Sequence, residues 1–188
     1  CSSLSKHREV SEHMADMEFM KILAPETIVT GLNVKDKAEA LDQMAELFVK
    51  AGNINDKTQF IKDVYVREEI GETGVGNYIA IPHGKSEAVV TPGVAIAVLD
   101  HEIEWESLDD TGAKVIILFA VGTDNEAAME HLKLLAMFSK RLGDDAVVAK
   151  LIGAGSVEDV IKALTEEAED AEEETEEEDI DLDDITIM

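Results

Sequence analysis

A histidine at the end of a glycine-punctuated segment is the clearest candidate for chemistry in this sequence. The segment runs from Thr73 to Gly84 and reads TGVGNYIAIPHG, so a glycine turn leads into a short apolar stretch that stops at a proline–histidine–glycine corner. We expect this corner to hold the imidazole of His83 in the open at the end of a strand. Neutral imidazole has a free nitrogen lone pair, which suits it to take up and release a group near neutral pH. His83 is therefore the candidate nucleophile.

Two further side chains are candidates to assist such a histidine. Arg67 ends an expected helix just before the glycine turn, and its guanidinium offers the planar fork that phosphate oxygens prefer. An ion pair with Asp63, four residues earlier, explains this arginine equally well. His131 comes near the start of a helix that follows a buried strand. Taken alone, a histidine in that place is more often a core or surface residue than a functional one.

Helical and buried-strand patterns alternate along the part of the chain that must position these residues. Helices are predicted over residues 36–52, 60–69, 128–142, 145–152 and 156–164, and strands over 78–82, 94–99 and 115–121. Short segments are expected at 28–31, on the margin of a sheet, and at 103–105, between the two long strands. This order predicts an α/β fold, a three-layer domain whose mixed, mostly parallel central sheet is flanked by helices on both faces.

Length and composition fit one domain with a sizeable core. The chain has 188 residues, of which 45% are hydrophobic, and no apolar run approaches the roughly 20 residues needed to span a bilayer. Its one cysteine, Cys1, allows no internal disulfide, which is typical of a reducing compartment. We therefore expect a cytoplasmic protein.

The net charge of −26 is concentrated at one end of the chain. Residues 165–188 contain fourteen acidic residues and no lysine or arginine. We expect this segment to be a disordered, solubilising tail, although apolar residues alternate with acids near its end and could dock on a partner. Residues 1–18 are interpreted as a poorly ordered lead, which leaves residues 19–164 as the folded domain. Nucleic acid is not expected as a partner, because an acidic surface repels its phosphates.

Two separated motifs resemble one known family, the enzyme IIA domain of the fructose-mannitol class of the bacterial sugar phosphotransferase system. The first joins Arg67-Glu68 to the glycine turn and to IAIPHG at 79–84, and is similar to the family's phosphorylation-site signature. The second is His131 with the following LKLLA. The resemblance covers about residues 21–164, including PGVA at 92–95 and WESLD at 105–109.

The resemblance implies a phosphoryl relay. The histidine phosphocarrier protein would donate a phosphoryl group to His83, which would pass it to a cysteine of an enzyme IIB domain. IIB and the membrane component IIC, on other chains, would then phosphorylate the imported sugar. Arg67 is expected to stabilise the phosphoryl charge and His131 to donate a hydrogen bond to it, with Thr73 and the amides of the glycine turn as further donors. No cofactor and no metal are implied, because the phosphate arrives already activated on another histidine.

One residue departs from the family pattern, and two other functions stay open. Tyr78 stands where glycine is frequent, so its ring either narrows the approach to His83 or lies on the surface. The nitrogen-related branch of the same family uses a similar histidine to regulate other proteins, but residues 85–89, 92–95 and 105–109 favour the sugar branch. A zinc site built from His83, His131 and Glu130 lacks any close-spaced ligand motif.

Overall fold

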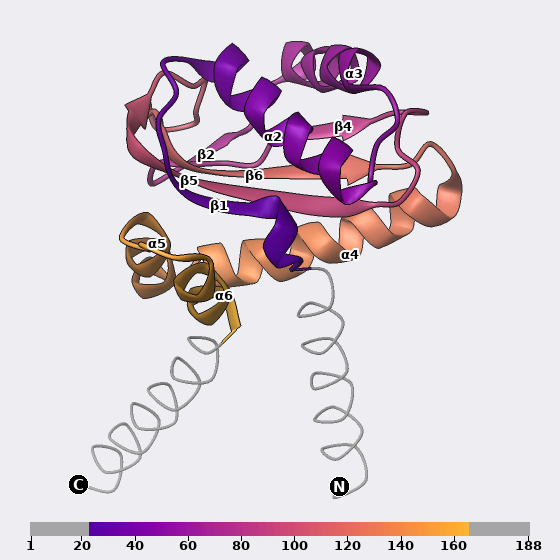
Figure 1. The fold of residues 1–188 in the computed structure, drawn as a ribbon. Coiled ribbons are helices and arrows are strands. Elements are labelled where there is room, and N and C mark those ends of the chain that lie inside the picture. Colours follow the sequence, from indigo (N-terminus) through magenta and orange to yellow (C-terminus); the bar gives the residue numbers. More distant parts are fainter. Residues whose placement is uncertain (1–22, 166–188) are drawn as a thin grey trace, which may run out of the picture.

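A six-stranded mixed sheet lies between two layers of helices (Figure 1). The computed structural model describes residues 23–165. The elements are, in chain order, η1 (Pro25–Thr27), β1 (Ile28–Leu32), α2 (Lys37–Ala51), α3 (Lys57–Ile70), β2 (Gly74–Gly76), β3 (Ile79–Ala80), β4 (His83–Lys85), β5 (Gly93–Ile103), β6 (Ala113–Val121), α4 (Asn125–Leu142), α5 (Asp145–Ile152) and α6 (Val157–Thr165).

The strand order is β1-β5-β6-β3-β2, with β4 also paired to β6. β1 runs parallel to β5, and both β3 and β4 run parallel to β6. The β5–β6 and β2–β3 pairs are antiparallel. The predicted α/β fold and mixed sheet are confirmed, and β1 lies at the sheet margin as expected. The sheet is only in part parallel, since its longest strands, β5 and β6, form an antiparallel pair.

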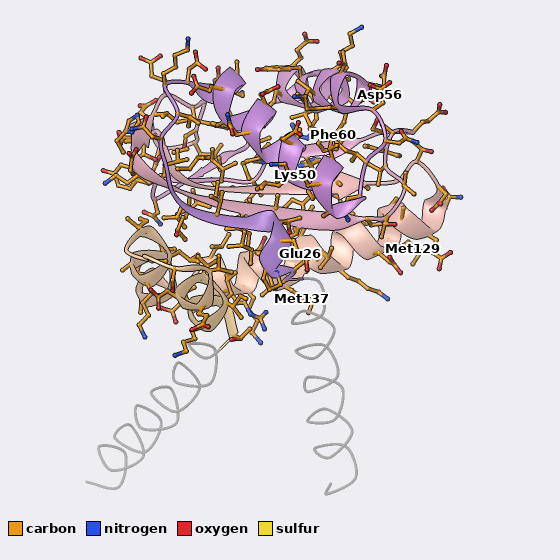
Figure 2. The ribbon with its side chains drawn as sticks, viewed as in Figure 1. Glu26, Lys50, Asp56, Phe60, Met129 and Met137 are labelled. Carbon is orange, nitrogen blue, oxygen red and sulfur yellow. The ribbon has the colours of Figure 1, made fainter. Side chains whose placement is uncertain are left out.

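Alternating side chains of the two central strands build a separate core on each face of the sheet. One core takes Val94, Ile96 and Val98 of β5 and is covered by α4, α5 and α6. The other takes the intervening Ala95 and Ala97 and is covered by α2 and α3. Figure 1 shows these two helix layers on opposite sides of the sheet, and Figure 2 shows the side chains between them. Burial on both faces explains the continuous apolar runs that predicted these strands.

Side-chain caps begin α2 and α6 where the sequence indicated, whereas α3 and α4 begin three residues earlier than predicted. The Asp36 carboxylate accepts a hydrogen bond from the Glu39 amide at the start of α2, and Gly52 ends that helix with a φ of 85°. Asp56 caps α3 in the same way. Ser156 Oγ accepts from the Asp159 amide before α6, which is one half of the predicted capping box, while the Asp159 carboxylate accepts from the Gly155 amide.

Two strand predictions are wrong in detail. The expected short segment at 103–105 is no separate element, because β5 continues to Ile103 through the polar, exposed residues 100–102. The predicted strand at 78–82 is broken into a turn, the two residues of β3 and a gap at 81–82. His83 therefore begins a strand, β4, instead of ending one.

The predicted lead at 1–18 and residues 166–188 of the predicted tail lie outside the described residues. Thr165 is the one residue of the predicted tail that the structure describes, and it ends α6. The boundaries of the lead and the tail therefore stay predictions. None of the helices between residues 23 and 165 combines the length and the apolar character needed to cross a membrane.

Candidate functional site

Close packing between β4 and α3 brings the candidate histidine beside the candidate arginine. Gly84 follows His83 in β4, and a Cβ atom at this glycine would lie 2.7 Å from Phe60 and 2.8 Å from Val64. Both of these side chains belong to α3. The missing side chain thus lets α3 approach β4, and the last turn of the helix places Arg67 within reach of His83.

Two hydrogen bonds fix the tautomer of the His83 ring. Arg67 Nε lies 3.0 Å from His83 Nε2, and His83 Nδ1 lies 3.2 Å from the carbonyl oxygen of Ile81. A guanidinium N–H only donates and a carbonyl only accepts, so Nδ1 carries the proton and Nε2 presents its lone pair. Partial burial lowers the pKa of His83, and the charge of Arg67 lowers it further. Nε2 is therefore the unprotonated nitrogen of a ring whose lowered pKa favours the neutral form near pH 7.

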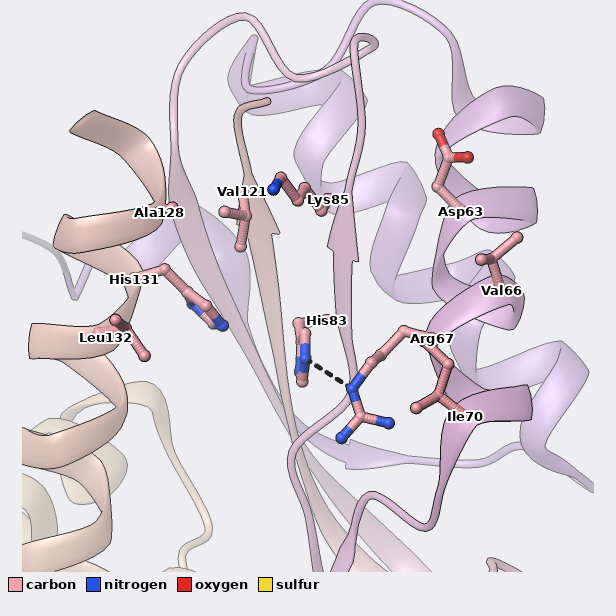
Figure 3. A pocket seen from close by; sticks show the side chains of 10 residues that line it. All are labelled: Asp63, Val66, Arg67, Ile70, His83, Lys85, Val121, Ala128, His131 and Leu132. Carbon is pink, nitrogen blue, oxygen red and sulfur yellow. Dashed lines mark hydrogen bonds between the residues drawn. The ribbon is translucent and has the colours of Figure 1, made fainter. Parts of the chain in front are cut away.

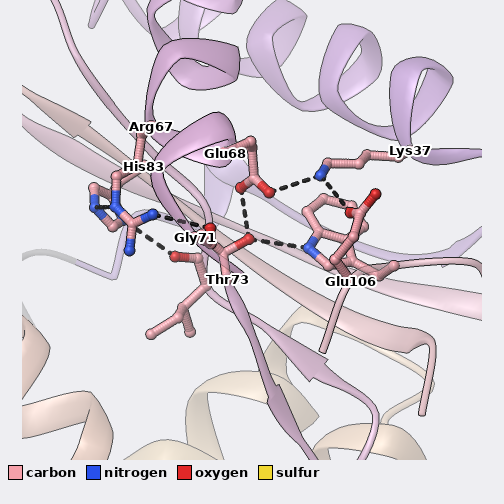
Figure 4. Close-up of polar contacts among 9 residues, drawn as sticks. Lys37, Arg67, Glu68, Gly71, Thr73, His83 and Glu106 are labelled. Atoms are coloured by element: carbon pink, nitrogen blue, oxygen red, sulfur yellow. Dashed lines mark hydrogen bonds and ion pairs between the residues drawn. The ribbon is translucent and has the colours of Figure 1, made fainter. Parts of the chain in front are cut away.

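Arg67 is directed to the histidine and not to the nearby acid. Its Nε donates to His83 (Figure 3), and its Nη1 donates to the carbonyl of Gly71 at 3.1 Å (Figure 4). Asp63 instead accepts from Gln59 on the same helix. Among the described residues no ion pair joins Arg67 to Asp63, so the ion-pair explanation of this arginine is not observed, and its role in phosphate binding stays a prediction.

His131 lies on the other side of His83. The two ring centroids are 5.0 Å apart, and the His131 ring also meets Phe119 edge-on at 5.2 Å. Both ring nitrogens of His131 are buried, and neither has a hydrogen-bond partner within residues 23–165. Burial, followed by the neighbouring His83, lowers the pKa of His131 to about 4. A buried polar group without a partner is unfavourable, so the ring nitrogens of His131 are candidates to bind a ligand beside His83.

A pocket of about 470 Å³ opens onto these three side chains (Figure 3). Its rim is apolar on two sides, with Val66 and Ile70 from α3 facing Leu132 from α4. These three side chains are 58%, 78% and 65% exposed, respectively, which is unusual for large apolar residues. Lys85, two residues after His83 on the same strand, also lines the pocket. The pocket thus joins two histidines and two basic side chains with an apolar rim, and Asp63 is the one acidic residue in its lining.

The structure does not bring Thr73 into this pocket. Its side chain is buried, its hydroxyl donates to Glu68 at 2.5 Å, and it accepts from the indole N–H of Trp105 at 3.0 Å (Figure 4). The amide of Gly74 is likewise used, since it donates to the carbonyl of Glu106 at 3.0 Å. The hydroxyl and this amide therefore have partners already, and the expected role of Thr73 as a phosphoryl donor has no support from its position.

Tyr78 lies in the turn between β2 and β3, away from the pocket lining. Both Asn77 and Tyr78 have a positive φ, 55° and 67°, which explains why glycine suits this position. The tyrosine ring is half-buried under the ammonium of Lys114, which lies 4.8 Å from the ring centroid. Of the two expectations for this ring, the surface position is the one observed.

The zinc site that the sequence left open has no ligand set in the described part of the chain. Among residues 23–165, no group of three or more His, Cys, Asp or Glu side chains could hold a metal ion. Glu130 is exposed, and Nε2 of His83 faces a guanidinium that would repel a cation. Sequence reasoning missed the role of Gly84, which was visible only as the end of a motif although it lets α3 approach β4.

Comparisons with a family model and with known proteins agree on one family. Residues 21–167 match the family model for the phosphoenolpyruvate-dependent sugar phosphotransferase system, EIIA 2. The chain is 32% identical over 128 residues, 68% of its length, to the 2-O-alpha-mannosyl-D-glycerate-specific EIIABC component of Escherichia coli, and spans 20% of that relative. It is 30% identical over 151 residues to a nitrogen regulatory protein of Klebsiella oxytoca, covering 80% of this chain and 91% of that one.

A solved structure shares the fold and extends the comparison. The complex of mannitol enzyme IIA with phosphorylated mannitol enzyme IIB from Escherichia coli aligns with a TM-score of 0.63 and 25% identity, over 75% of this chain and 95% of that one. The chain spans only about a fifth of the length of the mannosylglycerate and fructose relatives that it matches. On the family match and these relatives, the chain belongs to the EIIA 2 family of the phosphoenolpyruvate-dependent sugar phosphotransferase system.

Proposed function

We propose that this protein is a phosphoryl carrier of the sugar phosphotransferase system, with Nε2 of His83 as the atom that carries the phosphoryl group. One observation carries the proposal. A half-buried imidazole lines a pocket between a guanidinium, which donates to its unprotonated nitrogen, and a second imidazole that has no hydrogen-bond partner among the described residues. Family membership supports a phosphoryl-transfer role.

The transfer step follows from the tautomer of His83. The Nε2 lone pair attacks phosphorus, the nitrogen–phosphorus bond of the donor phosphohistidine breaks, and its electron pair returns to the donor nitrogen. The proton stays on Nδ1 throughout and is donated in a hydrogen bond to the Ile81 carbonyl. Arg67 Nε must leave Nε2 as the new bond forms, and its guanidinium then faces the phosphoryl oxygens. In the second step a thiolate of enzyme IIB attacks phosphorus, and the electron pair returns to Nε2.

Stabilisation of the transferred group falls to the two residues beside His83. The phosphoryl group spreads negative charge over three oxygens, so fixed donors aimed at those oxygens contribute more than any covalent help. Arg67 would supply charged N–H groups on one side. His131 would supply a neutral ring N–H on the other, which would also give its buried nitrogen a partner.

The apolar rim suits partners that must bring a reacting atom close to His83. Val66, Ile70 and Leu132 would pack against the donor and then the acceptor, because desolvating large exposed apolar side chains is favourable. The histidine phosphocarrier protein is the proposed donor. Enzyme IIB is the proposed acceptor, and the related mannitol IIA protein has been solved in a complex with phosphorylated IIB. Membrane IIC would take part only through IIB, and a cytoplasmic location stays a prediction.

A regulatory role is the second candidate, because a nitrogen regulatory protein aligns over 80% of this chain. Transfer from the phosphorylated protein to a IIB domain of the same organism separates the two. A carrier should lose its phosphoryl group to IIB within seconds and acquire it on the IIB cysteine. A protein that keeps its phosphoryl group with every IIB domain of its organism, and binds another protein in one phosphorylation state only, would be the regulator.

A further inference from the structure

We propose that Lys37, Glu68, Thr73 and Trp105 form a positioning network that holds Arg67 against His83. The network lies behind the pocket and touches neither the pocket space nor a phosphoryl group in it. Its effect on transfer rate rests on the proposed function, whereas its effect on the Arg67–His83 contact does not.

The network is a continuous set of short polar contacts (Figure 4). Lys37 Nζ lies 2.6 Å from Glu68 Oε2, and Glu68 Oε1 accepts the hydroxyl proton of Thr73 at 2.5 Å. The Thr73 oxygen in turn accepts from Trp105 Nε1 at 3.0 Å. Lys37 closes the set, since its ammonium also lies 4.7 Å from the centroid of the Trp105 ring. Each oxygen of the Glu68 carboxylate therefore has its own donor.

Burial makes these contacts strong and hard to replace. The Glu68 side chain is 6% exposed, Thr73 is 2% exposed and Trp105 is 7% exposed. Water has little access to take over a lost hydrogen bond in such a place, and a charged donor or acceptor strengthens the bond. The network thus has one favourable arrangement of side chains, which is what a positioning role requires.

Glu68 transmits this rigidity to the site because it is the next residue after Arg67 in the last turn of α3. Successive helical side chains diverge by about 100°, so Glu68 faces the network while Arg67 faces the pocket. Arg67 Nη1 also donates to Gly71. The hydrogen bond between Glu68 and Thr73 holds the other end of the short loop that contains Gly71. Loss of the Thr73 hydroxyl would release both the last helical turn and the loop that Arg67 contacts.

The contacts also tie together segments that are distant in the sequence. Lys37 is the first residue of α2, and Trp105 follows β5. Lys37 Nζ lies 2.8 Å from Glu106 Oε2 as well. The end of α3 is thereby fixed to the start of α2 and to the segment after β5. Neither of these segments contributes a side chain to the pocket.

Thr73→Val tests the network without changing any charge. Valine keeps the shape of threonine but removes the hydroxyl, leaving Glu68 and Trp105 each without one partner. Thr73→Ser keeps the hydroxyl and is the rescue variant. Thr27→Val is the matched control, because Thr27 is also 2% exposed and donates a buried hydrogen bond, to the Val94 carbonyl at 2.7 Å, away from the site.

We expect phosphoryl acceptance by Thr73→Val to be about tenfold to a hundredfold slower, as for a misplacement of about 1 Å. Thr73→Ser and Thr27→Val should stay within about twofold of wild type. The pKa of His83, followed by NMR, should rise in Thr73→Val because the guanidinium that lowers it retreats. In an Arg67→Gln background, Thr73→Val should slow transfer no further.

Either of two results would overturn the network. The Thr73→Val variant could transfer phosphate as fast as the Thr27→Val variant. Alternatively, Thr73→Val could slow transfer in the Arg67→Gln background by the same factor as in the wild type. If Thr73→Val does not fold, Lys37→Met opens the same network from its other end, and the same rate comparisons apply. A wild-type protein that accepts no phosphate would refute the proposed function alone. The His83 pKa in the three variants would then still decide whether the network positions Arg67.

Discussion

Adding one methyl group at Gly84 should damage the site without touching any polar residue in it. A Cβ atom there would lie 2.7 Å from a ring carbon of Phe60 and 2.8 Å from a methyl of Val64, where ordinary contact begins at 3.4 Å. α3 would have to move away from β4 by about 0.7 Å. Arg67 moves with the helix, so its 3.0 Å contact with His83 Nε2 would be lost.

The expected cost of Gly84→Ala is about 1–3 kcal/mol of unfolding free energy, since this is the usual range for an overpacked core. Phosphoryl acceptance should slow by about tenfold or more, because sub-ångström to ångström misplacement weakens electrostatic stabilisation steeply. Thermal melting and a stopped-flow or quenched transfer assay measure the two effects separately. The melting temperature should fall by several degrees while the protein stays folded at 25 °C.

Gly155→Ala is the control, because a Cβ atom at Gly155 meets nothing within 4 Å and the glycine does not have a positive φ. It should leave both stability and transfer near wild type. Gly84→Ala with a wild-type transfer rate would show that close approach of α3 to β4 is not what sets the arginine–histidine contact. Equal losses in the two variants would refute the reasoning as well.

Three other changes have defined outcomes. His131→Ala should still take up phosphate but pass it on about a hundredfold more slowly, since it removes one fixed donor and keeps the nucleophile; undiminished transfer to IIB would remove His131 from the mechanism. The pKa of His131 falls from 6.5 to about 4 on folding, so the unfolded state binds more protons. The unfolding free energy should therefore fall as pH drops from about 6.5 to 4, and less so in His131→Gln. An equal fall in both proteins, measured by urea titration, would contradict that assignment. Removal of residues 166–188, which leaves α6 whole, should keep the transfer rate near wild type, and a large loss would make the tail a docking element.

Patterns of local origin were predictable from the sequence. β5 and β6 are apolar on both faces because helices cover both, and Asp36 and Ser156 cap helices through contacts three residues away. The motif around His83 was readable because its glycines, proline and histidine all lie in one short segment, residues 73–84. The far end of β5 was not predictable, since residues 100–102 are polar and exposed although they continue the strand.

Contacts between distant segments were not readable. The Arg67–His83 bond depends on how closely α3 packs over Gly84, which no local pattern reveals. The hydroxyl of Thr73 is adjacent to the glycine turn in sequence, yet it is directed to Glu68 and Trp105. Strands as short as β3 and β4 offer too few residues for a periodicity to show.

Intact-mass measurement tests the central claim most directly. The full chain and its His83→Ala variant are incubated with phosphoenolpyruvate, enzyme I and the histidine phosphocarrier protein of the same organism. The account predicts an acid-labile gain of one phosphoryl group in the wild type and no gain in the variant. A wild type that gains nothing from active donors, or a His83→Ala variant that gains as much as the wild type, would contradict it.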